Sequence, residues 1–275
     1  MSLTMSTHSE ASPHMTVEGE DTAPMCNLYA MMKTRAEAAR IARAMTDRNN
    51  NQPPQPGIYP DYEAPVIIVG EDGQREMRNM RWGMPSSKKA LFDAASKRAD
   101  TLRKKGTEFD FDELLRMEPD KGTTNVRNTM NVQGKPNAHW RPWLGPANRC
   151  LVPFTSFAEP DQDFEGTRKN IWFAFGEERP LAFFAGIWTP HACVRMKSKG
   201  WEDVQAYGFL TTDSAPPVKT YHAKAMPVIL TEEVDLDLWL SGAPWDEVRH
   251  LQRPLPDGVL QIVAQGVRQD EAQPG

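Results

Sequence analysis

Several classes of site are absent from this sequence. Its 275 residues include only three cysteines, Cys26, Cys150 and Cys193, and no Cys-x-x-Cys pair. This scarcity argues against a zinc site or a disulfide framework and is typical of a reducing cytoplasm. The sequence also lacks a Gly-x-Gly-x-x-Gly motif, a Walker loop and a His-Glu-x-x-His motif. We therefore expect neither a metal nor a cofactor.

Long apolar runs are missing as well. No stretch approaches the roughly 20 apolar residues of a membrane span, and the N-terminus lacks the basic region and apolar segment of a signal peptide. The hydrophobic fraction of 39% and the charged fraction of 25% fit a globular protein. We expect a cytoplasmic protein with no membrane partner, and a monomer as the default state.

Negative charge prevails, but it is unevenly placed. The net charge is −5, and residues 1–25 hold four acidic residues and no basic one, so the rest of the chain is nearly neutral. Residues 81–106 hold eight Lys or Arg against two Asp, and residues 124–149 hold four basic residues and no acid. Such clusters permit a local phosphate-binding face. The alternative is that the first cluster is only the solvated face of a helix.

Periodicity and turn signals predict an α+β fold. A capping box predicts a helix from Thr34 to about Asp47, residues 87–105 are predicted to form a basic helix, and a short helix is predicted over 231–242 with Thr231 as its cap and Gly242 as its stop. Strands are predicted at 64–70, 170–176, 180–188, 204–212, 226–230 and 259–267, with hairpin turns at 71–74 and 177–180. Since no regular βαβ alternation occurs, we expect one domain with a largely antiparallel, twisted sheet flanked by helices.

Four separate segments carry polar groups that could meet in one pocket. They contain Cys26, Asn125, Glu159 and His222. Each residue also has an ordinary explanation: a buried apolar cysteine, a turn-capping asparagine, a surface glutamate at a strand end and a structural histidine. Spacing alone does not decide between these alternatives. For Cys150 and Cys193, which lie in or beside apolar stretches, the structural explanation is preferred.

Taken in chain order, seven motifs resemble the SRAP family, the SOS response-associated peptidases that process abasic sites in DNA. The resemblance covers about residues 25–265, and it rests on the motifs Met25-Cys26-Asn27, RWGMPS (81–86), NVRNT (125–129), RCLVPFTSFAEP (149–160), FAGIW (184–188), LTTDS (210–214) and HAKAMPVIL (222–230). No single motif is specific, but seven in order are. The resemblance implies an open-barrel-like sheet and a DNA-repair role beside the nucleoid during DNA damage.

The resemblance also implies roles for individual residues. Cys26 would be the crosslinking nucleophile, Asn125 would hold the sugar and the amine, and Glu159 and His222 would transfer protons. The partner would be single-stranded DNA that contains an abasic site. Six further residues would contact that DNA: Arg127, Trp82, Pro60, Arg81, Lys224 and Thr212. Of these, Trp82 and Pro60 would line the groove and stack on bases beside the lesion, and Arg127 would contact phosphate.

Residue chemistry agrees with an N-terminal Cys26. A free α-amine has a pKa of about 7.7–8.0, so a useful fraction is uncharged at neutral pH and can form a Schiff base with the aldehyde of an abasic sugar. The thiol of the same residue then adds to the imine and closes a thiazolidine, an intramolecular step with a high effective concentration. Loss of water from the carbinolamine needs a proton donor, for which Glu159 or His222 would serve.

The position of Cys26 in the chain sets the expected domain boundaries. We expect residues 1–25 to be a disordered leader or tag, residues 26–267 to be the SRAP domain, and residues 268–275 to be a loose tail. Met25 would be the true initiator, so that its removal frees the Cys26 amine. A second possibility is that the protein cleaves its own Met25–Cys26 bond. A third possibility is that the chain is inactive while its leader is in place.

Two other functions stay open. An N-terminal-cysteine amidohydrolase or peptidase would use Cys26, Asn125 and Glu159, but would not need Trp82 or the basic segments. A non-catalytic single-strand-binding module would bind intact DNA with a steep salt dependence and would not depend on Cys26. The near-neutral charge of the body disfavours this module.

Overall fold

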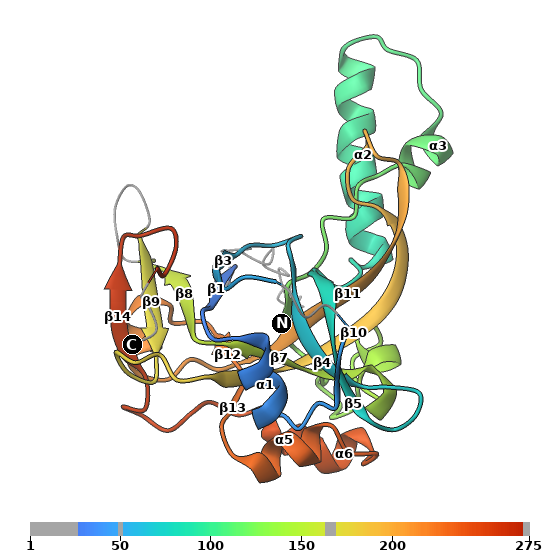
Figure 1. Ribbon diagram of the computed structural model, residues 1–275. Coiled ribbons are helices and arrows are strands. Elements are labelled where there is room, and N and C mark those ends of the chain that lie inside the picture. The colour runs from blue at the N-terminus through green and yellow to red at the C-terminus, as the bar shows by residue number, and fades with distance from the viewer. Residues whose placement is uncertain (1–26, 49–51, 163–168, 272–275) are drawn as a thin grey trace, which may run out of the picture.

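The computed structural model describes residues 27–48, 52–162 and 169–271. Its centre is a twisted sheet in which strands follow the order β11-β10-β7-β4-β5. These strands are β4 (Glu63–Val69), β5 (Arg75–Trp82), β7 (Arg149–Phe154), β10 (Ala182–Val194) and β11 (Trp201–Thr212). Because β11 also pairs with β5, the sheet closes on itself as a barrel (Figure 1). The predicted α+β class with a barrel-like, largely antiparallel sheet is confirmed.

A second sheet lies against this barrel, at the left of Figure 1. It has the order β14-β9-β8-β1-β3, formed by β1 (Leu28–Met31), β3 (Gln55–Ile58), β8 (Ser156–Pro160), β9 (Asn170–Ala174) and β14 (Gln261–Gln265). The chain passes from β7 in the barrel to β8 in this sheet at Thr155, and both strands are buried along their whole length.

The predicted hairpin turn at 71–74 is confirmed, because β4 and β5 pair antiparallel with Val69 opposite Arg75. The second predicted hairpin, at 177–180, is wrong. The strands on its two sides belong to different sheets: β9 pairs with β8 and β14, whereas β10 pairs with β7, β11 and β13. A tight turn in the sequence therefore serves here as a crossing between layers.

Four short strands complete the sheets. They are β2 (Thr46–Asp47), β6 (Asn125–Val126), β12 (Met226–Pro227) and β13 (Ile229–Leu230). The single strand predicted at 226–230 is thus split at Val228, whose amide donates to the Leu210 carbonyl, with β12 pairing to β11 and β13 to β10.

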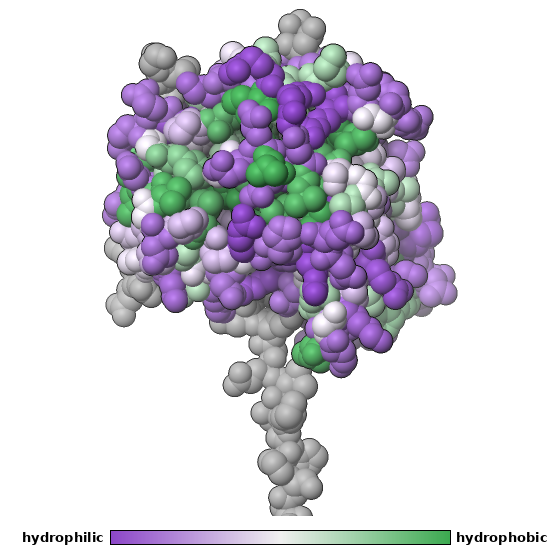
Figure 2. All heavy atoms as spheres, turned by 90° about the horizontal axis from the view of Figure 1, so that it is seen from below, coloured by the Kyte–Doolittle hydropathy of each residue, from purple (hydrophilic) through white to green (hydrophobic). Residues whose placement is uncertain are grey.

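Helices pack around the barrel: α1 (Arg35–Ile41), α2 (Lys88–Lys104), α3 (Phe111–Arg116), α4 (Val218–Tyr221), α5 (Glu233–Trp239) and α6 (Trp245–Val248). Helices α2 and α3 project as an arm beside the far end of the β10–β11 hairpin, and α5 and α6 lie under the barrel (Figure 1). From below, apolar side chains gather in the middle of a mainly polar face (Figure 2).

The helix caps show which boundary signals were reliable. Thr34 accepts a hydrogen bond from the Glu37 amide, as its capping box predicts, and Ser87 caps α2 in the same way. Helix α1 nevertheless ends at Ile41 rather than near Asp47, because Arg43 adopts a positive φ of 52°. The cap predicted at Thr231 is wrong: α5 begins after Glu232 and has no side-chain cap.

The end of the chain is less loose than predicted. Asp270 is buried, accepts a hydrogen bond from the Ser156 hydroxyl at 2.5 Å, and pairs with Arg179 at 2.8 Å. The prediction of a loose tail is therefore wrong for residues up to 271, because these contacts fasten the segment to the second sheet. In the described ranges, no helix has both the length and the apolar character to cross a membrane.

Candidate functional site

Strand β11 arranges the site segments along one of its edges. Ala206 and Tyr207 pair with the end of β5, Phe209 and Leu210 pair with β6, and Thr211 and Thr212 pair with β12. Three segments that are distant in sequence therefore follow one another along a single strand. At about 3.3 Å per residue, the seven residues 206–212 extend over roughly 20 Å. Three of the four motifs singled out from the sequence meet at this edge or beside it.

Glu159 lies where the second sheet approaches this edge. It is 1% exposed and belongs to β8, whose neighbour Ala158 pairs with Leu28 at the start of β1. Continuing that antiparallel register by one residue sets Asn27 across from Glu159. The chain thus enters β1 beside a buried carboxyl group. Cys26 immediately precedes Asn27 and lies outside the described residues.

His222 follows α4 and is wholly buried. Its Nδ1 atom donates to the Ala225 carbonyl at 2.8 Å and lies 3.9 Å from Oε2 of Glu159. The amide of Gln162, just past β8, donates to the Tyr221 carbonyl at 3.0 Å and so fastens the Glu159 strand to this loop. Because the carbonyl can only accept, Nδ1 carries the proton and Nε2 has the lone pair.

Burial keeps His222 neutral. It lowers the pKa of the imidazole from its ordinary value, and the positive charges of Lys224 and Arg127 act in the same direction, whereas the hydrogen bond to Ala225 opposes them. His222 therefore offers Nε2 as a proton acceptor at neutral pH. Among the described residues, Nε2 has no hydrogen-bond partner.

Asn125 belongs to β6, and Arg127 is the first residue after that strand. Arg127 donates to the Lys224 carbonyl at 2.5 Å and to the Asp213 carboxylate at 3.1 Å, and this joins β6 to the loop that holds His222. Its side chain stays 30% exposed. Asn125 is buried and donates to the Thr124 hydroxyl at 2.9 Å. The structure therefore brings Arg127, Lys224, Glu159 and His222 into one region, with Asn125 two residues from Arg127.

Two polar atoms near this region were missed. The buried hydroxyls of Thr211 and Ser214 have no hydrogen-bond partner within the part of the chain that the structure describes. Both belong to the LTTDS motif, from which only Thr212 was selected. The motif pointed to this segment, but strand alternation could not be assigned to individual residues before the β11–β12 register of Thr211 with Pro227 was known.

The remaining predicted DNA contacts occupy different environments. Pro60 and Thr212 are half-buried, and Lys224 is exposed. Arg81 lies at the opposite end of the β11 edge, where it pairs with Glu202 at 3.2 Å and Asp61 at 3.7 Å. Its guanidinium is thus already engaged with two carboxylates.

The stacking role predicted for Trp82 requires correction. The indole is 0% exposed, stacks on Phe209 with ring centroids 5.2 Å apart, and meets Tyr29 edge-on. Its Nε1 donates to the Thr124 carbonyl at 3.2 Å. A ring that is enclosed on all sides cannot stack on a base, so Trp82 belongs to the core, where it packs the segment before Asn125 against the barrel.

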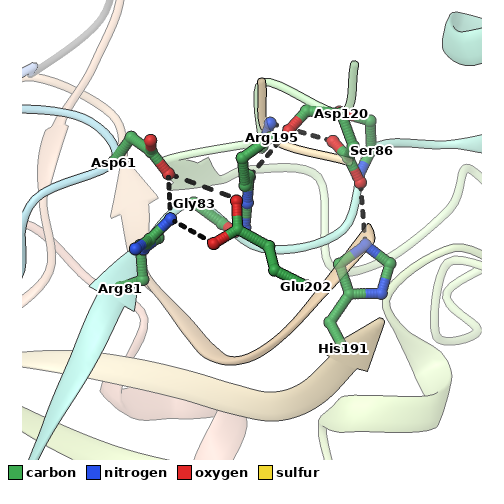
Figure 3. A network of polar contacts seen from close by, with 9 residues as sticks. Asp61, Arg81, Gly83, Ser86, Asp120, His191, Arg195 and Glu202 are labelled. Carbon is green, nitrogen blue, oxygen red and sulfur yellow. Dashed lines mark hydrogen bonds and ion pairs between the residues drawn. The ribbon is translucent and has the colours of Figure 1, made fainter. Parts of the chain in front are cut away.

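A polar network that the sequence did not suggest lies between Arg81 and the arm (Figure 3). Arg195 donates to the carbonyls of Gly83 and Asp120, and the Asp120 carboxylate lies 2.9 Å from Nε2 of His191. The hydrogen bond to Asp120 raises the pKa of His191 to about 9, and Cys193 contributes to this shift. Although burial opposes it, hydrogen bonds from His191 and Ser86 lower the pKa of Asp120.

The cysteines and the metal prediction can be compared with the structure in part. Cys150 on β7 and Cys193 on β10 are buried free thiols, as the preferred structural explanation predicts. Within residues 27–48, 52–162 and 169–271, no three His, Cys, Asp or Glu side chains gather as metal ligands would.

Known proteins resemble this chain in sequence family and in fold. The fold is similar to that of two proteins from Bordetella bronchiseptica, one described as phage-related, and one from Bacteroides thetaiotaomicron. The first shares 22% identity at a TM-score of 0.56, covering 88% of this chain and 98% of its own. The phage-related protein shares 16% sequence identity at a TM-score of 0.57, and the match covers 89% of this chain and 95% of that protein. The Bacteroides protein shares 19% identity at a TM-score of 0.57, and the match covers 86% of this chain and 90% of that protein.

No curated protein gives a significant match. The family model described as SOS response associated peptidase (SRAP) matches residues 25–269. This range begins at Met25 and includes every motif from which the resemblance was drawn. The chain therefore belongs to the SRAP family.

Proposed function

We propose that this protein covalently captures abasic sites in single-stranded DNA through Cys26 when Cys26 is the N-terminal residue. The observation that carries the proposal is the buried pair of Glu159 and neutral His222, whose Oε2 and Nδ1 atoms are 3.9 Å apart. The pair lies at the N-terminal end of β1, the strand that follows Cys26. Membership of the SRAP family supports the same chemistry.

The proposed reaction begins at the aldehyde of the ring-opened sugar. The uncharged α-amine of Cys26 attacks the aldehyde carbon, and a proton moves from nitrogen to oxygen to give a carbinolamine. The carbinolamine loses water when its hydroxyl receives a proton, which leaves an imine. The Cys26 sulfur then bonds to the imine carbon while the thiol proton passes to the nitrogen, and the thiazolidine closes.

The buried residues supply the proton transfers in this scheme. Nε2 of His222 accepts the proton that the Cys26 nitrogen loses after its attack, and it relays the thiol proton to that nitrogen during ring closure, since its lone pair is available at neutral pH. Glu159 delivers a proton to the departing hydroxyl. Asn125 orients the sugar, and Arg127, which is partly exposed beside Lys224, contacts a phosphate next to the lesion.

The residues before Cys26 require a second step in this proposal. Where Met25 is the initiator, its removal frees the amine. Where the leader is present, the Cys26 thiol would attack the Met25 carbonyl, release the amine as a thioester forms, and water would then hydrolyse the thioester. Both routes end with the same N-terminal cysteine.

Denaturing electrophoresis tests the proposal. The protein beginning at Cys26, the full chain, and Cys26→Ala in the first form are each mixed with an oligonucleotide that has one abasic site. We expect a heat-stable shifted band only where Cys26 is N-terminal. No band from any folded form would contradict covalent capture and would favour the amidohydrolase alternative, which hydrolysis of a small amide substrate would then test.

A further inference from the structure

A cationic cleft lies on the arm, away from Glu159 and His222. It has a volume of about 770 Å³ and is formed by α2, the start of the segment that returns from α3 to the barrel, and the turn of the β10–β11 hairpin. Its described lining holds five basic side chains and one acid: Lys97, Arg98, Lys105, Lys121, Lys197 and Glu118.

Most of this positive charge is unneutralised. Glu118 is bound by Arg98 through two hydrogen bonds of 2.7 and 2.8 Å. Within the described part of the chain, the four lysines have no ion pair. A solvated helix face would place such lysines on one helix only. Here Lys121 and Lys197 come from other segments and face the same cleft as Lys97 and Lys105, which points to a polyanionic ligand.

The cleft also has an apolar component and a suitable length. Ala90, Leu91, Ala94, Leu102, Leu114 and Pro119 line it between the charges. Lys97 and Lys105 are eight residues apart, a helical rise of about 12 Å, which is the length of roughly three stacked nucleotides at about 3.4 Å each. Alternating charge and apolar surface suits the phosphates and sugars of a nucleic acid strand.

The cleft walls are fixed to each other. Arg98 holds Glu118, the Asp120 amide donates to the Val194 carbonyl at 2.8 Å, and Arg195 donates to the Asp120 carbonyl at 3.0 Å. The last of these contacts is visible in Figure 3. The helix, the connecting segment and the hairpin, which carry the lysines, are therefore already positioned relative to one another before a ligand arrives, and this lowers the entropic cost of binding.

One wall of the cleft is close along the chain to a residue of the proposed reaction site. Lys121 is four residues before Asn125, so their Cα atoms are at most about 14 Å apart along an extended chain. We propose that the cleft binds the phosphate backbone of single-stranded DNA flanking the abasic nucleotide, a few nucleotides from the lesion. This inference rests on the proposed function for its partner, but it concerns a surface that the reaction chemistry does not need.

The test compares two triple variants of the full chain. One replaces Lys97, Lys105 and Lys197 with Gln. The matched control replaces Arg40, Arg249 and Arg268 with Gln; these are exposed, lie outside the lining of the cleft and remove the same charge. Fluorescence anisotropy measures binding to a single-stranded oligonucleotide with a tetrahydrofuran site, which lacks an aldehyde and cannot crosslink. Circular dichroism confirms folding of both.

For the cleft variant we expect at least tenfold weaker binding at low salt. We also expect the slope of log K against log salt to become shallower by about 2, since each lost phosphate contact on a single strand removes roughly 0.7. The control should change much less. The oligonucleotide is then shortened on one side of the lesion at a time. Binding by the unaltered protein should weaken for only one of the two shortened forms, and binding by the cleft variant should not weaken further for either.

Equal behaviour of the two variants would overturn the inference. Tighter binding of poly-glutamate than of the oligonucleotide, lost in the cleft variant, would also overturn it and assign the cleft to an acidic protein. The reaction is judged separately on the Cys26-first protein. If the Cys26-first protein captures the abasic site but the cleft and control variants bind the oligonucleotide equally well, only the cleft is refuted. If the cleft variant alone binds more weakly but no covalent capture occurs, only the crosslinking chemistry is refuted.

Discussion

The Nδ1 atom of His222 lies 3.9 Å from Oε2 of Glu159, and both side chains are almost wholly shielded from solvent. The two residues come from segments 63 positions apart, and a backbone hydrogen bond from Gln162 to Tyr221 joins those segments. The separation is too long for a hydrogen bond. It sets a proton acceptor and a carboxyl group side by side at the point where the chain enters β1.

Replacement of Glu159 by Gln should slow capture while the fold is retained. Gln has nearly the same shape but cannot donate an acidic proton, and proton transfer by a positioned group contributes about 10²–10⁴-fold to rates. We expect the single-turnover rate of crosslinking by the Cys26-first protein to decrease about 10²–10⁴-fold in Glu159→Gln. Glu178→Gln, at an exposed position, is the control. A rate equal to that of the control would remove Glu159 from the mechanism.

The pH dependence of capture should contain a step from His222. Because the pKa of His222 is lowered, the acceptor is present near neutral pH and is lost as the pH falls through a value below 6.5. A second step is expected near the amine pKa of about 7.7–8.0. In His222→Gln the lower step should vanish while the upper one remains. His250→Gln serves as the control, because His250 makes a similar bond to the Glu247 carbonyl but is exposed.

The same shift has a consequence for stability. The unfolded chain binds a proton at His222 more readily than the folded chain does, so the free energy of unfolding should rise with pH up to about 6.5. Urea titrations of the unaltered protein and of His222→Gln at pH 5 and 7 would measure this. A difference between the two proteins that is the same at both pH values would contradict the lowered pKa.

The pair of His191 and Asp120 should behave in the opposite way. A pKa raised to about 9 means that its stabilisation is fully present below about pH 6.5 and is lost as the pH rises through about 9. His191→Gln should lower the free energy of unfolding by on the order of 1–3 kcal/mol at pH 6, allowing for the partial exposure of the ring. At pH 10 the loss should be much smaller. An unchanged loss at pH 10 would show that packing, not charge, accounts for it.

Gly122 tests whether the network in Figure 3 depends on close packing. A Cβ atom at Gly122 would lie 2.5 Å from Nη1 of Arg195 and 2.7 Å from Cα of Gly83. Gly134 has a similar positive φ, but nothing lies within 4 Å of its Cβ position. Both alanine variants therefore carry the backbone strain, and only Gly122→Ala adds overpacking, which typically costs about 1–3 kcal/mol. Equal unfolding free energies would contradict a tight junction there.

How much of this structure the sequence predicted depends on the range of the signal. Most local signals succeeded: the capping box at Thr34 opens α1 and the turn at 71–74 joins β4 to β5, although the cap expected at Thr231 does not form. Signals that depend on distant partners failed. The turn at 177–180 looks like a hairpin, but β9 and β10 find their partners in different sheets. Closure of the barrel by β5 and β11 likewise has no local signature.

The site shows the same division. Motifs identified Glu159, His222 and Arg127 as candidates, and the structure brings their segments together. Residue type misled for Trp82, because a tryptophan in a polar motif suits base stacking as well as it suits a core. His191 and Asp120 were missed, since neither lies in a motif and their contact depends on how the arm folds back on the hairpin.

The central claim is that the bond to DNA forms at Cys26 as a thiazolidine. Mass spectrometry of the crosslink, after protease and nuclease digestion, tests it most directly. We predict an adduct on the peptide that begins with Cys26, one water lighter than the sum of peptide and abasic nucleotide, with neither the amine nor the thiol open to alkylation. An adduct on a lysine, or on Cys26 with its thiol still free, would contradict the account.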